Sequence, residues 1–233
     1  TSTMALPWVS GLAVVLLVAG LVWGFFFTPE DYKQGSTVKI IYLHVPSAMM
    51  AVSAWFMMLV GSLIWLIRRH HVSALAAKAA APVGLTFTVI GLVTGAIWGQ
   101  PMWGTWWVWD ARLTSELILF FLYLGYIALT SAIDDVRRAD RAGALIAIVG
   151  AINVPIIYFS VKWWNTLHQG ASVSLTRSPS MAQLMLWGML LMALAMWVYT
   201  LAIVCYRVRT LIIERERHTD WVQALPEVAG AKA

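Results

Sequence analysis

Six stretches of apolar sequence, each long enough to cross a lipid bilayer, dominate this chain of 233 residues. A helix needs about 20 mostly apolar residues to span the hydrocarbon core. Apart from Glu116 in the fourth, and from His44 just before the second, the stretches hold no Asp, Glu, Lys, Arg or His. The first lacks a basic flank and a cleavage site, so it is expected to be a span and not a signal peptide. We expect spans over residues 6–27, 45–67, 80–98, 113–133, 142–161 and 181–206, forming one all-α membrane domain over residues 1–233.

The composition excludes several classes of protein. Hydrophobic residues make up 61% of the chain and charged residues only 12%, which is unlike a soluble domain or a disordered segment. A single cysteine, Cys205, excludes a disulfide framework and a multi-cysteine metal site. The sequence has no P-loop, no C-x-x-C-H, no G-x-S-x-G and no H-E-x-x-H motif. The chain is therefore not expected to hydrolyse ATP itself or to be a c-type cytochrome.

Basic residues are distributed unequally between the two sides of the predicted bundle. Segments 68–79, 134–141 and 207–233 hold 11 of the 16 Lys and Arg residues. By the positive-inside rule these segments are cytoplasmic, and six spans then leave both termini in the cytoplasm. Since the charges are dispersed over loop flanks, we expect no nucleic-acid partner.

The second outer segment, residues 98–112, is exceptionally rich in tryptophan. Five of the chain's 14 Trp lie within 12 residues there, at positions 98, 103, 106, 107 and 109. Tryptophan is common at membrane interfaces, so an aromatic belt is one interpretation. A belt needs only one or two anchors per helix end, however, and these side chains cannot all face lipid. The alternative is an indole-lined shelf, in a loop between the third and fourth helices, that binds a flat apolar ligand.

Two of the five histidines lie on the same predicted outer face. His44 is at the outer end of the second span, and His168 is in the third outer segment, close to Trp163 and Trp164. Either histidine could be an ordinary hydrogen-bonded structural residue. Together they could instead ligate one metal centre.

Heme suits two imidazoles beside a broad aromatic surface better than zinc does. Zinc requires three or four clustered protein ligands, whereas heme iron takes axial ligands on two faces of a flat apolar macrocycle. Arg112, Lys33 or Lys39 could meet the anionic propionates. Asp110 could cap the fourth span or hold the loop in shape. Arg112 and Glu116, four residues apart, could pair.

These residues resemble a known family. The stretch Trp103-Gly104-Thr105-Trp106-Trp107-Val108-Trp109-Asp110 matches W-G-x-x-W-x-W-D, the motif of the tryptophan-rich heme-handling (WWD) proteins. With six spans and the segment Tyr42 to Pro46, the chain is most similar to the heme exporter protein C subgroup of the bacterial cytochrome c maturation (Ccm) system. The resemblance implies that heme b is held at the periplasmic face with His44 and His168 as axial ligands. The expected heme-binding residues are Trp98, Trp103, Gly104, Trp106, Trp107, Trp109, Asp110, Arg112, Trp163 and Trp164.

The resemblance also implies partners and a location. Such proteins sit in the bacterial inner membrane and present heme to a periplasmic heme chaperone. They work with the ATPase and permease subunits of an ABC transporter and with a small single-span membrane protein.

Three other functions stay open from the residues alone. A membrane b-type cytochrome that transfers electrons would need about four buried histidines at two depths. A heme-conducting exporter would need polar groups along its path, and only Asn153 and Gln183 are candidates. A structural subunit of an ABC assembly would use the Trp cluster to dock a partner and would be colourless.

Overall fold

The computed structural model describes residues 2–170, 172–173 and 178–225, and in this part of the chain it is helical with no β-strand. The eight α-helices of this part are α1 (Ser2–Val22), α2 (Ile41–Arg68), α3 (His71–Trp103), α4 (Ala111–Ala132), α5 (Val136–Gly150), α6 (Asn153–Trp163), α7 (Gln183–Arg215) and α8 (Asp220–Gln223). A π-helical turn, η1 (Trp23–Phe27), continues α1, and a 3₁₀ turn, η2 (Ser36–Ile40), leads into α2.

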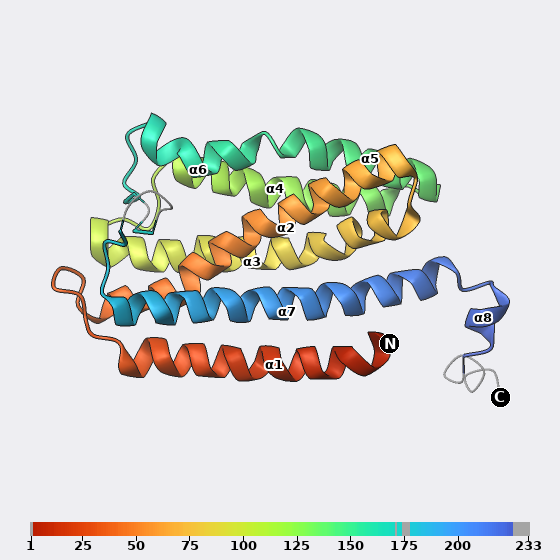
Figure 1. The fold of residues 1–233 in the computed structure, drawn as a ribbon. Coiled ribbons are helices and arrows are strands. Elements are labelled where there is room, and N and C mark those ends of the chain that lie inside the picture. The colour runs from red at the N-terminus through yellow and green to blue at the C-terminus, as the bar shows by residue number, and fades with distance from the viewer. Residues whose placement is uncertain (1, 171, 174–177, 226–233) are drawn as a thin grey trace.

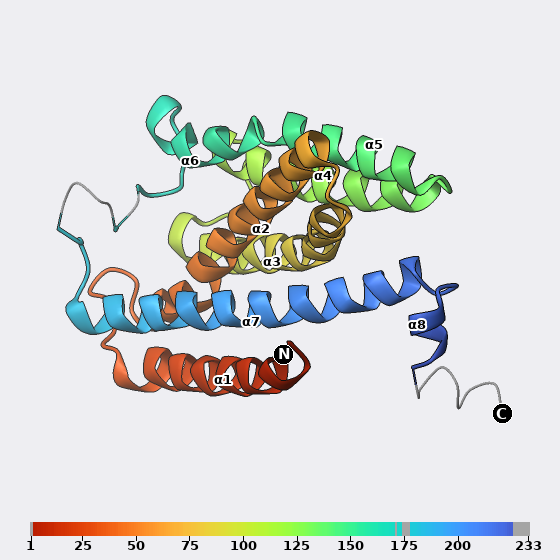
Figure 2. The ribbon, with the colours of Figure 1, turned by 45° about the vertical axis from the view of Figure 1, so that its right-hand side comes forward.

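Six helical segments in the described residues are long and apolar enough to cross a membrane, with α5 and α6 together forming the fifth. The predicted all-α membrane fold with six spans is therefore confirmed. Helices α2 and α3 form the centre of the bundle (Figure 1). Helices α1 and α7 lie side by side on one flank, and α4, α5 and α6 cover the other, as the turned view in Figure 2 also shows.

Small residues allow the central helices to approach closely. A Cβ on Gly61 would lie 2.7 Å from the Ser73 carbonyl oxygen, so the α2–α3 contact depends on this glycine. The Tyr123 hydroxyl of α4 reaches past Gly84 of α3 and donates a hydrogen bond to the Ala51 carbonyl of α2 at 2.7 Å. Close approach at small residues is the usual way for helices to associate in a membrane, where lipid competes for apolar surface.

The fifth span differs from the single helix expected over residues 142–161. It breaks after Gly150, and α6 begins at Asn153. Pro155 lacks the N–H group that would continue the helix, which favours a break just before it. Gly150 leaves room for Trp55, whose Nε1 donates to the Ala147 carbonyl at 3.1 Å. The Asn153 side chain then ties α6 to α4 by donating to the Ser115 carbonyl at 2.9 Å.

The Trp-rich segment also differs from the loop expected over residues 98–112. Helix α3 continues to Trp103, so the connection to α4 consists only of residues 104–110. Gly104 ends the helix in the left-handed conformation, with φ at 74°, and its N–H donates to the Gln100 carbonyl. Trp98 and Trp103 are therefore on a helix, whereas Trp106, Trp107 and Trp109 are on the loop.

Candidate functional site

The candidate site is at the end of the bundle where α2 and α4 begin and α3 and α6 end (left in Figure 1). His44, in the first turn of α2, is held against α3 through its Nδ1 atom. This atom lies 3.1 Å from both the Gly91 carbonyl oxygen and the Thr94 Oγ1. Since Thr94 Oγ1 donates its proton to the Ile90 carbonyl, it must accept from His44. His44 therefore carries its proton on Nδ1, and in the neutral ring Nε2 keeps a free lone pair.

His168 lies in the segment that follows α6, and its protonation is fixed in the same way. Its Nδ1 atom is 2.7 Å from the Gln169 carbonyl oxygen, which can only accept. Burial of the imidazole, and then the nearby Arg112 guanidinium, lower the pKa of His168 below its ordinary value of 6.5. The ring is therefore neutral near pH 7, with the lone pair on Nε2.

The fold brings the two histidines together although they are far apart in sequence. Their ring centroids are 6.3 Å apart, and the ring planes are inclined by 36°. Gly95 leaves space at His44, because a Cβ there would lie 3.0 Å from His44 Cε1. Within the described residues, no third His, Cys, Asp or Glu joins them to form a larger metal-ligating group. The pair thus offers two imidazole nitrogens and no carboxylate.

Asp110 connects the Trp-rich loop to the segment that carries His168. Its Oδ1 accepts from the Leu113 amide at 2.8 Å and caps α4, as an N-terminal aspartate commonly does. Its Oδ2 accepts from the Leu167 amide at 3.0 Å. Asp110 therefore caps α4 with one carboxylate oxygen and holds the Trp-rich loop to the His168 segment with the other.

The suggested pairing of Arg112 with Glu116 is wrong. Arg112 Nη1 instead donates to the Ile157 carbonyl of α6 at 2.6 Å. In the part of the chain described here, Arg215–Asp140 is the only ion pair, and both Glu116 carboxylate oxygens are buried without a hydrogen-bond partner. The Ile157 carbonyl also accepts from the Ser160 hydroxyl at 2.9 Å, so Arg112 shares this acceptor within α6.

The tryptophans divide into a buried group and an exposed group. Trp98 is buried, packs edge-on against His44 at 5.6 Å between centroids, and donates to the Gln34 side-chain oxygen at 2.9 Å. Trp107 packs edge-on against Trp109, and its Nε1–H is buried with no partner among the described residues. Of the seven tryptophans predicted to contact heme, the other five have exposed side chains, namely Trp103, Trp106, Trp109, Trp163 and Trp164.

Sequence reasoning missed the residues that orient the predicted ones. Gly91, Thr94 and Gly95 form one face of α3 toward His44, and Gln34 holds Trp98. Small residues at helical spacing are common wherever membrane helices pack, so nothing distinguished these three in the sequence. The hydrogen bond from Trp98 to Gln34 spans two outer segments and has no sequence pattern.

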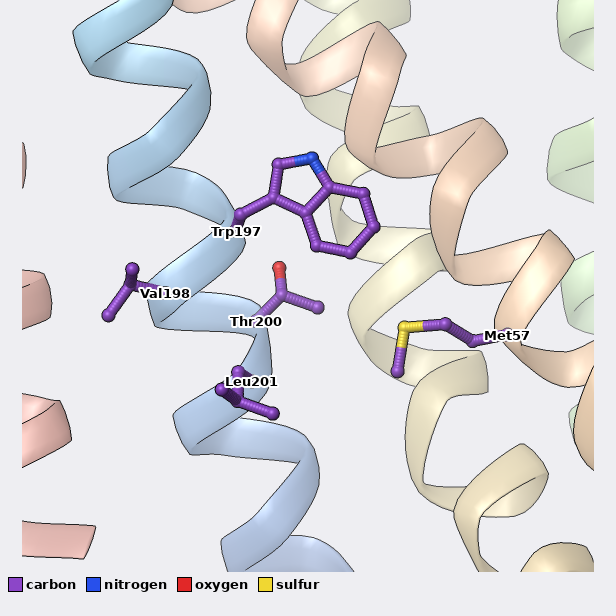
Figure 3. Close-up of a pocket in the computed structure, with 5 residues that line it drawn as sticks. All are labelled: Met57, Trp197, Val198, Thr200 and Leu201. Carbon is purple, nitrogen blue, oxygen red and sulfur yellow. The ribbon is translucent and has the colours of Figure 1, made fainter. Parts of the chain in front are cut away.

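A separate cavity of about 300 Å³ lies between α2 and α7, away from the histidines (Figure 3). Met57, Trp197, Val198, Thr200 and Leu201 line it. The Thr200 hydroxyl is directed to Met50 Sδ, so the cavity surface is apolar. Its lining residues include no histidine and no charged side chain, and it is not a candidate for the functional site.

Comparisons with known proteins point to one family. A family model described as heme exporter protein C matches residues 1–223, a range that contains every residue of the site. The chain is 55% identical to heme exporter protein C of Paracoccus denitrificans over 216 residues, 92% of this chain and 89% of that protein. It is 46% identical to heme exporter protein C of Escherichia coli K12 over 228 residues, 97% of this chain and 91% of that protein. The same description applies to a protein of Haemophilus influenzae, 45% identical over 224 residues, 95% of this chain and 90% of that protein.

Proposed function

Because the chain belongs to the heme exporter protein C family, we propose that it holds heme b at the outer face of the membrane and delivers it for cytochrome c maturation. One observation carries the proposal: His44 and His168 lie together, each with Nδ1 committed to a hydrogen bond. A metal-ligating histidine commonly donates its other ring N–H to a carbonyl or carboxylate, which orients the ring. Both histidines already have this arrangement.

The spacing of the two rings is compatible with one iron between them. Two imidazoles that held one metal ion would have ring centroids about 6 Å apart, because a metal–imidazole bond is about 2 Å long and the nitrogen is about 1 Å from the ring centre. The observed 6.3 Å fits this value. Two protein ligands are enough for heme because the porphyrin supplies the other four.

The residues around the two histidines are suited to bind the porphyrin ring and the propionates of heme. The indoles of Trp103, Trp106 and Trp109 are exposed and can contact a flat apolar ligand, and Trp163 and Trp164 precede the His168 segment. The Arg112 donors that are not bonded to Ile157 can bind the anionic propionates. Gly104 lets the chain turn between the helix-borne and loop-borne tryptophans. We therefore propose the ten predicted residues as heme contacts and the two histidines as iron ligands.

Delivery requires a recipient and an energy source outside this chain. We propose a periplasmic heme chaperone as recipient, an ABC transporter with ATPase and permease subunits as energy source, and a small single-span protein as a further neighbour. The sequence has no ATP-binding P-loop of its own. The charge asymmetry supports an inner-membrane orientation with the histidines on the periplasmic side.

The test is an absorption spectrum of the detergent-purified protein, oxidised and reduced, with heme quantified per chain. We expect about one heme per chain and low-spin bands typical of two axial imidazoles. His44→Ala and His168→Ala should each abolish the low-spin spectrum and lower heme content at least fivefold. His70→Ala and His71→Ala are matched controls, because both imidazoles are exposed at the opposite end of the bundle.

Two results would contradict the proposal. If both site variants kept the wild-type spectrum and heme content, the two histidines would not be the ligands. If the wild-type protein were colourless and took up no added hemin, the exposed tryptophans would instead be a docking surface for a protein partner.

A further inference from the structure

A second cavity, of about 340 Å³, lies at the end of the bundle opposite the histidines, among α3, α4, α5 and the end of α7. In contrast to the cavity in Figure 3, it is lined by charged and hydroxyl side chains. Those that matter here are Lys78, Tyr126, Ser131, Asp134, Asp140 and Arg215. None of these residues belongs to the proposed heme site.

One wall of the cavity is an ion pair that joins two helices. Arg215 of α7 donates to both carboxylate oxygens of Asp140 of α5, with N–O distances of 3.0 and 3.2 Å. A bidentate pair of this kind has a defined geometry, and the two side chains are only 19% and 10% exposed. The two charges neutralise each other, and the two hydrogen bonds hold both side chains in place. Arg215 keeps further N–H donors that a ligand in the cavity can use.

Two further charges in the cavity have opposite signs and do not meet. Lys78 of α3 is half-buried, and Asp134 lies in the turn between α4 and α5. Within the described ranges, neither has an ion-pair or hydrogen-bond partner, although both line the same cavity. A ligand that carries both a negative and a positive group could therefore satisfy both residues at once.

The position of the cavity favours a lipid. It is at the helix ends, between the last turns of α4 and the first turns of α5, on the side that the basic residues predict to be cytoplasmic. That is the level of the phospholipid headgroups. Apolar Ile133 and Val136 also line it, and Val136 is 48% exposed, which provides a surface for the start of an acyl chain.

We propose that this cavity binds a zwitterionic phospholipid whose headgroup ends in a primary ammonium, that is, a phosphoethanolamine headgroup. Lys78 and Arg215 bind the phosphate, with the Tyr126 and Ser131 hydroxyls as further donors. Asp134 accepts N–H bonds from the ammonium. A purely anionic glycerol headgroup would leave Asp134 facing a negative ligand, and a trimethylated ammonium has no N–H to donate. The balance of charges therefore selects the primary amine.

The experiment measures lipid retention by the full-length, heme-loaded or heme-free protein in native mass spectrometry. The delipidated protein is incubated with equal amounts of phosphatidylethanolamine, phosphatidylglycerol and phosphatidylcholine. We expect preferential retention of phosphatidylethanolamine. Lys78→Gln should weaken it about fivefold, the contribution typical of one interfacial charge. Asp134→Asn should remove the preference over phosphatidylglycerol. Glu30→Gln, which removes an exposed charge at the opposite end of the bundle, is a control that should leave the lipid preference unchanged.

Each other outcome overturns the proposal. Equal retention of the three lipids, or a preference that survives both variants, would mean that the cavity does not select the headgroup. Soluble glycerophosphoethanolamine, which has the headgroup without acyl chains, distinguishes binding of a lipid from binding of the headgroup alone. If it competes as well as the lipid at equal concentration, the site does not bind a lipid. Heme content is measured in parallel, because the lipid proposal predicts that both variants keep the wild-type value.

Discussion

Asp110 Oδ2 accepts a hydrogen bond from the Leu167 amide at 3.0 Å, which joins the Trp-rich loop to the segment that carries His168. Leu167 immediately precedes His168, so the position of this histidine depends on the loop between α3 and α4. His44, in contrast, is on a helix and is bound directly to α3. The two proposed ligands are therefore held by different means, one rigidly and one through a single carboxylate.

Asp110→Asn should separate the two roles of Asp110. Asparagine is as good a helix cap as aspartate, but its amide oxygen can serve the Leu113 amide while its NH₂ cannot accept from Leu167. We expect an almost unchanged melting temperature and about fivefold weaker heme retention, the usual value of one hydrogen bond. Hemin titration and thermal unfolding measure the two effects.

The matched control for Asp110 is Asp135, which caps α5 at the other end of the bundle by accepting from the Arg138 amide at 2.7 Å. Asp135→Ala should cost about 1 kcal/mol of stability and leave heme retention unchanged. If Asp110→Asn retained heme as well as the wild type does, the Asp110–Leu167 bond would have no part in holding His168.

Trp109→Ala should weaken heme binding, because this indole is 76% exposed on the proposed heme surface. Loss of one aromatic contact is expected to lower affinity about threefold to tenfold. Trp8, on α1 and 82% exposed, is a control of the same residue type and similar exposure. Trp8→Ala should bind hemin like the wild type. Equal losses in the two variants would indicate a general effect of removing an interfacial tryptophan.

The lowered pKa of His168 predicts how the stability of the heme-free protein depends on pH. Below about pH 6.5 the unfolded chain takes up a proton at this imidazole that the folded protein resists, since burial and Arg112 lower the folded pKa. The contribution of His168 to the free energy of unfolding is therefore fully present above pH 6.5, and it falls as the pH drops toward the pKa of His168 in the folded protein. Thermal unfolding between about pH 7.5 and 5 should show a flatter pH dependence for His168→Gln than for the wild type. A wild-type slope in His168→Gln would contradict the lowered pKa.

Gly84→Ala tests the packing at the centre of the bundle. A Cβ at this position would lie within 2.5 Å of three atoms of Tyr123, so α3 and α4 would have to separate. Overpacking of this kind costs about 1–3 kcal/mol and would also disturb the hydrogen bond from Tyr123 to Ala51. Gly125, on α4, is the control, because a Cβ there would have nothing within 4 Å. Gly125→Ala should leave the melting temperature unchanged or raise it slightly. A stable Gly84→Ala protein would show that the helices repack easily.

The sequence was sufficient to predict the membrane fold because long uncharged stretches have few alternatives to membrane helices. The two outer histidines singled out in the sequence do lie together in the fold, and their role as ligands stays a prediction. What could not be predicted depends on contacts between distant segments: His44 with Thr94, Trp98 with Gln34, and Arg112 with Ile157. Arg112 and Glu116 show the difficulty, because their spacing favours a pair within α4, yet a carbonyl on another helix takes the guanidinium.

The break between α5 and α6 would allow α6 to tilt independently of α5. Its 11 residues extend about 16 Å from Asn153, the residue that fixes its near end to α4. A tilt of about 10° around that point displaces the far end by about 3 Å, which exceeds the tolerance of a metal–nitrogen bond. His168 follows that far end, while α2 with His44 is packed in the centre of the bundle. A small rotation of α6, the outer half of the fifth span, would therefore separate the two histidines while α5 and the other five spans kept their places in the bundle.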